Sequence, residues 1–240
     1  MGQSYFIWKN KDCRSMGVKL SGPVPIVRPE ERVEHVQIPG RSGDLTELEG
    51  AEVYNSYIQT ATILVHGGYR VREIYNWLKG AGYVTFSGEP DRRQKARVIG
   101  AITLNKHSYN LDWWTGEVQF YCQPLKEKLQ GETVTITSSG TAVMNAGDVV
   151  SKPKITMTAS GTSANVSAGG KQILLMSLTS GHKYEIDAET CEVIDVTNAA
   201  APVIHTNQST GEFPVLNPGS NSVTGSGWSQ LVIEKRERFL

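Results

Sequence analysis

The side chains that most often carry out catalysis or bind metals are scattered along this chain. No two histidines form an HExxH pair, which would place two zinc ligands on one helix face. No serine lies in a GxSxG turn, the setting of the nucleophile in many hydrolases. We therefore expect ordinary surface or strand positions for the five histidines, His35, His66, His107, His182 and His205.

Two short stretches imitate ligand-binding loops but have the wrong spacing. AGGKQ (168–172) resembles the end of a phosphate loop, yet Asn165 stands where the first glycine is needed and Gln172 replaces Ser or Thr. EIDAETCEVID (185–195) lacks the DxDxDG spacing of a calcium loop. We predict a hairpin turn for the first and an acidic turn between two strands for the second. The spatial pairing of carboxylates that glycoside hydrolysis needs stays open.

Composition narrows the classes further. The 240 residues carry 24 basic and 24 acidic side chains, which argues against nucleic-acid binding through a general basic surface. The cysteines, Cys13, Cys122 and Cys191, are odd in number and show no CxxC spacing, so a reduced compartment is expected rather than disulfides or zinc. No apolar run approaches a membrane span. We predict no catalytic residue, no cofactor, no metal and no membrane partner, and hence no enzyme.

The first half, 1–131, is predicted to be a β-rich domain with one short helix. Strand-like runs cover 4–9, 33–38, 51–66, 83–87, 96–104 and 116–125. In the run 33–38, VEHVQI, apolar and polar residues alternate, which predicts a half-buried strand. The helix, of about ten residues, has an apolar stripe that must dock on a core. Its members are Val71, Ile74, Tyr75 and Leu78.

The second half, 132–240, has a different texture. Short strands such as KITMTA, KQILLM and KYEIDA recur at near-regular spacing, with turns rich in Gly, Ser and Asn between them. Many short alternating strands without a helical period are typical of an antiparallel β-sandwich. The aromatic residues here are few, and we interpret Trp228 as part of the core rather than as a platform for a sugar ring.

The stretch IPGRSGDL (38–45) holds one arginine in a stiff corner. Pro39 and Gly40 stop the preceding strand, and Gly43 closes the loop around Arg41. A rigid loop loses little entropy on docking, and a guanidinium can bind a carboxylate or several carbonyl oxygens at once. Pro39, Gly40, Arg41 and Gly43 are therefore our candidate contact with another subunit. The plain alternative, a tight turn with a solvated Arg41, stays open.

The order of these features resembles the distal tail proteins of siphophages, the hub components of the tail tip or baseplate. The matching pieces cover nearly the whole chain: Trp8-Lys9-Asn10, VPIVRPEE (24–31), IPGRSGDL, the helix with Trp77-Leu78, GYVTFSGEPDRRQKARV (82–98), FYCQP (120–124), SKPKITMTASGT (151–162), YEIDAE (184–189) and GEFPVLNPGSNSV (211–223).

The resemblance implies a ring-forming N-terminal domain and a galectin-like C-terminal sandwich. It also implies a homohexamer that joins the tail tube protein to the tail-tip, tail-associated or fibre protein. Such a protein is part of the virion and is assembled in the host cytoplasm. An alternative function, from another class, is recognition of host-surface glycans through the sandwich. Balanced charge and the lack of a catalytic motif agree better with the structural role.

Overall fold

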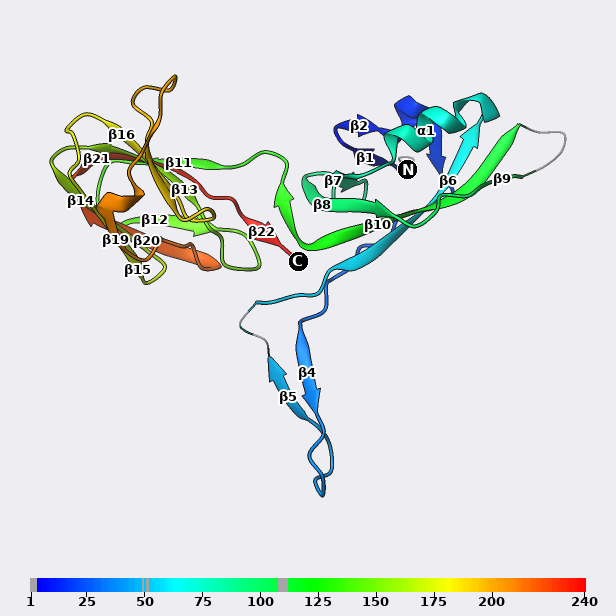
Figure 1. Ribbon diagram of the computed structural model, residues 1–240, viewed down its shortest axis with the longest axis horizontal. Coiled ribbons are helices and arrows are strands. Elements are labelled where there is room, and N and C mark those ends of the chain that lie inside the picture. Colours follow the sequence, from blue (N-terminus) through cyan, green and yellow to red (C-terminus); the bar gives the residue numbers. More distant parts are fainter. Residues whose placement is uncertain (1–3, 49, 51, 108–111) are drawn as a thin grey trace. The chain divides into compact units, whose positions relative to one another are not determined.

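The computed structural model describes residues 4–48, 50, 52–107 and 112–240 (Figure 1). The chain divides into two compact units, Met1–Leu129 with Leu240 (unit 1) and Gln130–Phe239 (unit 2). Each unit encloses an apolar core of its own. The predicted fold class, mainly β with one short helix, is confirmed. The sequence predicted a domain boundary between residues 131 and 132, and the roles assigned to the two domains stay predictions.

Unit 1 is built from short strands around one long strand. Its strands are β1 (Phe6–Trp8), β2 (Lys11–Asp12), β3 (Val18–Leu20), β4 (Val33–Val36), β5 (Leu45–Leu48), β6 (Tyr57–His66), β7 (Ala81–Phe86), β8 (Arg92–Ile99), β9 (Leu104–Lys106) and β10 (Trp113–Lys128). Its helical turns are η1 (Cys13–Met16), η2 (Gly68–Arg70) and the α-helix α1 (Val71–Trp77). Of the run predicted at 51–66, Tyr57–His66 is a strand and residue 51 lies outside the described residues. The run predicted at 96–104 divides at Gly100, whose φ is +70°.

Strand β10 is the centre of the unit 1 sheet, which runs β2-β1-β7-β8-β10-β6-β3 with β9 also beside β10. Residues 113–122 pair with β6, and residues 119–128 pair with β8. The register with β8 shifts between Cys122 and Lys126. Pro124 lies inside this interval, and because it lacks an N–H it cannot donate to the ladder. The irregularity therefore falls where the backbone cannot pair.

Helix α1 docks on the core through fewer residues than its sequence predicts. Ile74 and Leu78 are buried, and Val71 packs partly against the same core. Tyr75 is 38% exposed, so its prediction as part of the docked face is wrong. The helix has only seven residues, and Trp77 takes the neighbouring core position instead.

Two tryptophans fasten this helix to the first strand. The Trp77 ring stacks on Phe6 with centroids 5.6 Å apart. Trp77 Nε1 donates to the Trp8 carbonyl oxygen at 3.2 Å, and Trp8 Nε1 donates to the Trp77 carbonyl oxygen at 3.1 Å. The indole N–H groups of the buried Trp8 and the partly buried Trp77 are both hydrogen-bonded, as buried polar groups require.

A hairpin formed by β4 and β5, residues 33–48, is a two-stranded sheet of its own; we call it the arm (Figure 1). The alternation in VEHVQI predicts a half-buried strand, and this prediction is wrong. Val33 is intermediate in exposure, whereas Glu34, His35 and Val36 are exposed. The physical reason is that no second layer of the described chain covers either face of the arm.

Unit 2 is made of two facing antiparallel sheets. One runs β11-β21-β13-β16-β17-β18 and the other β12-β20-β14-β15-β19. Residues from both sheets form its core, including Ile155, Val166 and Ile173. Its elements are β11 (Thr133–Ile136), β12 (Thr141–Asn145), β13 (Lys154–Ala159), β14 (Ser163–Ala168), β15 (Lys171–Met176), β16 (Lys183–Asp187), β17 (Glu192–Asp195), β18 (Val203–Ile204), η3 (Thr206–Gln208), β19 (Ser209–Gly211), β20 (Gly219–Ser226), β21 (Trp228–Glu234) and β22 (Arg238–Phe239).

Both sequence stretches that imitate ligand loops are hairpin turns, as predicted. Ala168 and Lys171 are paired across a two-residue turn, and Gly169 and Gly170 adopt φ of +61° and +79°. Positive φ at both central positions is the geometry that Gly-Gly favours in tight hairpins. The acidic stretch is the turn between β16 and β17, where Asp187 pairs with Glu192.

Candidate functional site

The tip of the arm is a tight turn that fixes the backbone of Arg41. Arg41 N donates to the Ile38 carbonyl oxygen at 3.2 Å, with Pro39 and Gly40 at the two central positions. Gly40 has φ of +81°, so Pro followed by glycine gives a type II turn. Gly43 also has φ of +81°, and a Cβ at either glycine would meet no atom within 4 Å. These glycines are needed for their backbone conformation and not for space.

The four predicted contact residues are thus brought together at one exposed tip. Pro39, Gly40, Arg41 and Gly43 are all exposed, and the Arg41 guanidinium has no ion pair within the part of the chain that the structure describes. Ile38, next to the turn, is 40% exposed. The geometry presents a charged side chain and apolar surface together, which suits a contact with another molecule.

The base of the arm is tied by backbone hydrogen bonds. Arg32 N donates to the Val53 carbonyl oxygen and Asn55 N to the Glu30 carbonyl oxygen, both at 2.8 Å. Arg32 Nε also donates to Asn55 Oδ1 at 3.2 Å. The arm therefore leaves unit 1 from a paired base.

Sequence reasoning missed the second strand of the arm. The sequence predicted one extended run after the corner at residues 38–43. In the structure, LTEL (45–48) turns back and pairs with VEHV (33–36). Two β-favouring runs on either side of a Pro-Gly-containing loop are a hairpin signal, so the information was present. The four-residue length of β5 made it easy to overlook.

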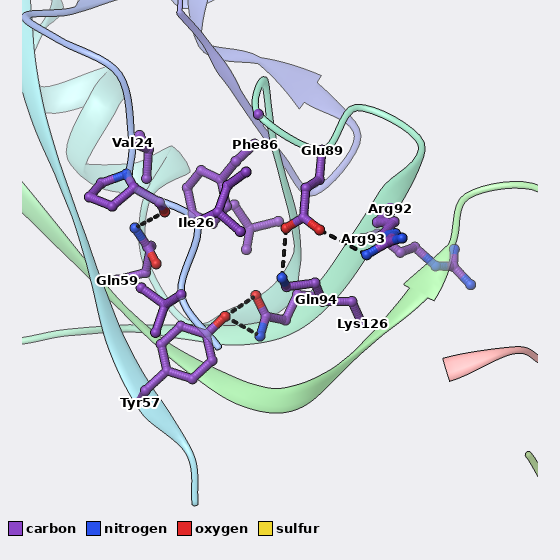
Figure 2. Close-up of a pocket in the computed structure, with 14 residues that line it drawn as sticks. Val24, Ile26, Tyr57, Gln59, Phe86, Glu89, Arg92, Arg93, Gln94 and Lys126 are labelled. Carbon is purple, nitrogen blue, oxygen red and sulfur yellow. Dashed lines mark hydrogen bonds and ion pairs between the residues drawn. The ribbon is translucent and has the colours of Figure 1, made fainter. Parts of the chain in front are cut away.

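A small pocket in unit 1 is lined by a partly buried ionic network (Figure 2). Lys126 Nζ lies 2.6 Å from Glu89 Oε2, and Arg92 Nη1 lies 2.9 Å from Glu89 Oε1. Burial raises the pKa of Tyr57 to about 12, and its hydroxyl exchanges hydrogen bonds with Gln94. The cavity is about 20 Å³, which is room for one water molecule.

The contacts around this pocket join neighbouring segments of unit 1. On its other side, Gln59 Nε2 donates to the Pro25 carbonyl oxygen at 2.9 Å, which holds the proline-rich stretch against β6. The Lys126 and Glu89 charges are paired and the amides are hydrogen-bonded, whereas the buried Arg93 Nε makes no hydrogen bond among the described residues. The volume of about 20 Å³ has no room for a ligand larger than a water molecule.

Two histidines of unit 2 each make a hydrogen bond with a different partner. His182 Nδ1 lies 2.8 Å from Asp195 Oδ2, and His205 Nε2 lies 2.8 Å from the Met176 carbonyl oxygen. These two rings flank the buried Tyr184, at centroid distances of 6.4 and 4.9 Å. Among the described residues, no three His, Cys, Asp or Glu side chains gather as a metal site.

The cysteines differ in accessibility. Cys13 and Cys122 are buried, and burial raises the pKa of both thiols, that of Cys122 to about 12. A thiol with so high a pKa is a poor nucleophile at neutral pH. Cys191, in the turn between β16 and β17, is exposed.

Unit 2 presents no exposed aromatic ring. Tyr184 and Phe239 are buried, and Phe213 and Trp228 pack against the core, with Trp228 Nε1 donating to the Asn165 carbonyl oxygen at 3.2 Å. Sugar rings commonly stack on exposed aromatic faces, so this surface does not favour the glycan-binding alternative. No helix in the described parts of the chain is long and apolar enough to span a membrane.

Comparison with known proteins gives a match in fold. The chain is similar to a solved structure whose title reads "Crystal Structure of SPP1 Dit (gp 19.1) Protein, a Paradigm of Hub Adsorption Apparatus in Gram-positive Infecting Phages". The match covers 100% of both chains with a TM-score of 0.77 at 18% sequence identity. No protein-family model and no curated protein sequence matches the chain. The shared property is therefore the fold, over the full length of both proteins.

Proposed function

We propose that this chain is a structural hub of a long, non-contractile phage tail. In this role it joins the distal end of the tail tube to the tail-tip, fibre or baseplate proteins that act in host adsorption. The observation that carries the proposal is the end-to-end similarity in fold to the SPP1 Dit protein, whose title names a hub adsorption apparatus. The chain would then be part of the virion, assembled in the host cytoplasm, and would need no cofactor and perform no catalysis.

The proposed assembly is a homohexameric ring formed by unit 1, with unit 2 as a galectin-like sandwich. The arm supports this arrangement because it is exposed, has no sheet neighbour within the described chain, and has a rigid tip. A two-stranded hairpin alone is marginally stable in water. Contact with another copy would give the arm the packing that its own chain does not supply.

The molar mass of the purified protein in solution tests this function. Light scattering should give six times the mass of one chain, and negative-stain electron microscopy should show closed rings. A single-chain mass at every concentration would contradict the ring. Binding of the full-length protein to a glycan array, without ring formation, would favour the carbohydrate alternative instead.

A further inference from the structure

Two carboxylates lie directly opposite each other on the arm. Glu34 of β4 pairs in register with Glu47 of β5, and both side chains are exposed. Cβ atoms of directly opposed residues are about 4.5 to 5.5 Å apart, so like charges there oppose strand pairing. Neither carboxylate has a basic partner among the described residues. The arm thus carries an acidic pair that its own chain does not neutralise.

Elsewhere in unit 1, an open cleft has the opposite character. Its volume is about 330 Å³, and it is lined by Gly17, Lys19, His66, Tyr69, Arg70 and Trp113. Of the described residues that line it, none is acidic. Asp112, which precedes β10, is engaged by Gly68 N at 3.1 Å and by Trp114 Nε1 at 2.9 Å. Neither Lys19 nor Arg70 makes an ion pair within the described part of the chain.

The two cations are held in place by their surroundings. Lys19 Nζ lies 5.5 Å from the centroid of the Trp113 ring, and the Arg70 guanidinium carbon lies 5.6 Å from that of Tyr69. A Cβ on Gly17, which has φ of +71°, would come within 2.4 Å of Arg70 Nη1. Glycine at this position therefore makes room for the guanidinium. Held cations lose less conformational entropy when an anion binds.

We propose that the Glu34–Glu47 pair of one copy's arm binds the Lys19–Arg70 cleft of a second copy. This contact rests on the proposed ring and names its partner surfaces. Two negative charges without basic partners match two positive charges without acidic partners. Exposed ion pairs add little to affinity, so these pairs mainly fix which surfaces meet and in which register.

A charge-reversal mixing experiment tests the contact. One variant carries Glu34→Lys and Glu47→Lys, and the other carries Lys19→Glu and Arg70→Glu. Each variant alone has like charges at every arm–cleft contact. The half-assembly concentration, at which half of the chains are in rings, should therefore rise at least about tenfold by analytical ultracentrifugation. In an equal mixture, alternating copies restore opposite charges at every contact. The mixture should therefore form rings at nearly the wild-type concentration.

The matched control reverses two exposed charges that belong to neither surface. Lys152→Glu combined with Glu192→Lys, both in unit 2, should leave assembly unchanged. Rings that form equally well in both test variants would overturn the arm–cleft contact and leave the hub function standing. Loss of assembly in both variants without rescue in the mixture would also overturn it. A wild-type chain that stays monomeric would overturn the ring, and the contact with it.

Discussion

Two hairpins in this protein each place two carboxylates opposite each other, and they differ in whether a cation lies beside the pair. In unit 2, the hairpin β16–β17 places Asp187 opposite Glu192, and Arg236 binds Asp187 through two hydrogen bonds of 2.8 and 2.9 Å. In the arm, Glu34 stands opposite Glu47 with no described cation beside them. Opposed acids are tolerated where a cation is supplied from within the chain. The arm has no such cation among the described residues, and in the proposed contact a second copy supplies it.

The strongest way to break this comparison is to remove the cation from the unit 2 hairpin. Arg236→Ala leaves the largely buried Asp187 carboxylate without its two charged hydrogen bonds. We expect a loss of about 2 to 3 kcal/mol in the free energy of unfolding, measured by denaturant titration. Arg28→Ala removes an exposed arginine that belongs to neither the arm nor the cleft, so it is the matched control and should stay within about 0.5 kcal/mol. Equal losses in the two variants would contradict the contrast between the hairpins.

The same pair predicts a dependence on pH. Burial is the largest single influence and acts to raise the pKa of Asp187. The hydrogen bonds and charge of Arg236, together with the backbone N–H groups of Glu189 and Thr190, outweigh it and leave the pKa below its ordinary value. A carboxylate with a lowered folded-state pKa contributes stability above its unfolded pKa, and this stability is lost as the pH falls through the folded value. The advantage of wild type over Arg236→Ala should be full at pH 7 and shrink below about pH 4. Thermal unfolding of wild type and Arg236→Ala at pH 7 and at pH 2 measures the difference in stability. A difference that persists at pH 2 would contradict this prediction.

A smaller effect is expected at the tip of the arm. Gly40→Ala forces an L-residue into φ of +81°, which costs about 1 kcal/mol locally. Hydrogen exchange of the arm amides should become about fivefold faster, while global unfolding stays unchanged. Gly22→Ala is the control, since Gly22 has an ordinary φ and open space around it. Unchanged exchange in Gly40→Ala would show that the turn does not hold the arm.

An effect of similar size is expected for Arg41 and tests its role. Arg41→Ala should leave the monomer folded and raise the half-assembly concentration about fivefold, since one exposed ionic contact is worth about 1 kcal/mol. Analytical ultracentrifugation measures this directly. An unchanged hexamer would mean that the arginine is solvated and that Pro39 and Gly40 serve only the turn.

Local patterns predicted the second half well. The turn at Gly169-Gly170 and the acidic turn before Glu192 follow from residue types a few positions apart, and both are present. The sandwich strands could be read because their alternation reflects burial by a sheet of the same chain.

The first half depends on contacts that no local pattern encodes. VEHVQI alternates like a half-buried strand, yet its arm has no covering layer in its own chain. Tyr75 fits the helical period but lies outside the core, because Trp77 pairs with Trp8 across a long sequence separation. The cleft formed by Lys19, Arg70 and Trp113 joins three separate segments, so only the folded chain could bring them together.

The three cysteines differ in burial, so one native position can be labelled selectively. With Cys13 and Cys122 enclosed and their thiols held protonated, a maleimide dye at neutral pH will react at Cys191. That position lies on unit 2, apart in sequence from both the arm and the basic cleft. Fluorescence transfer between labelled copies can thus follow association in real time without altering a single residue.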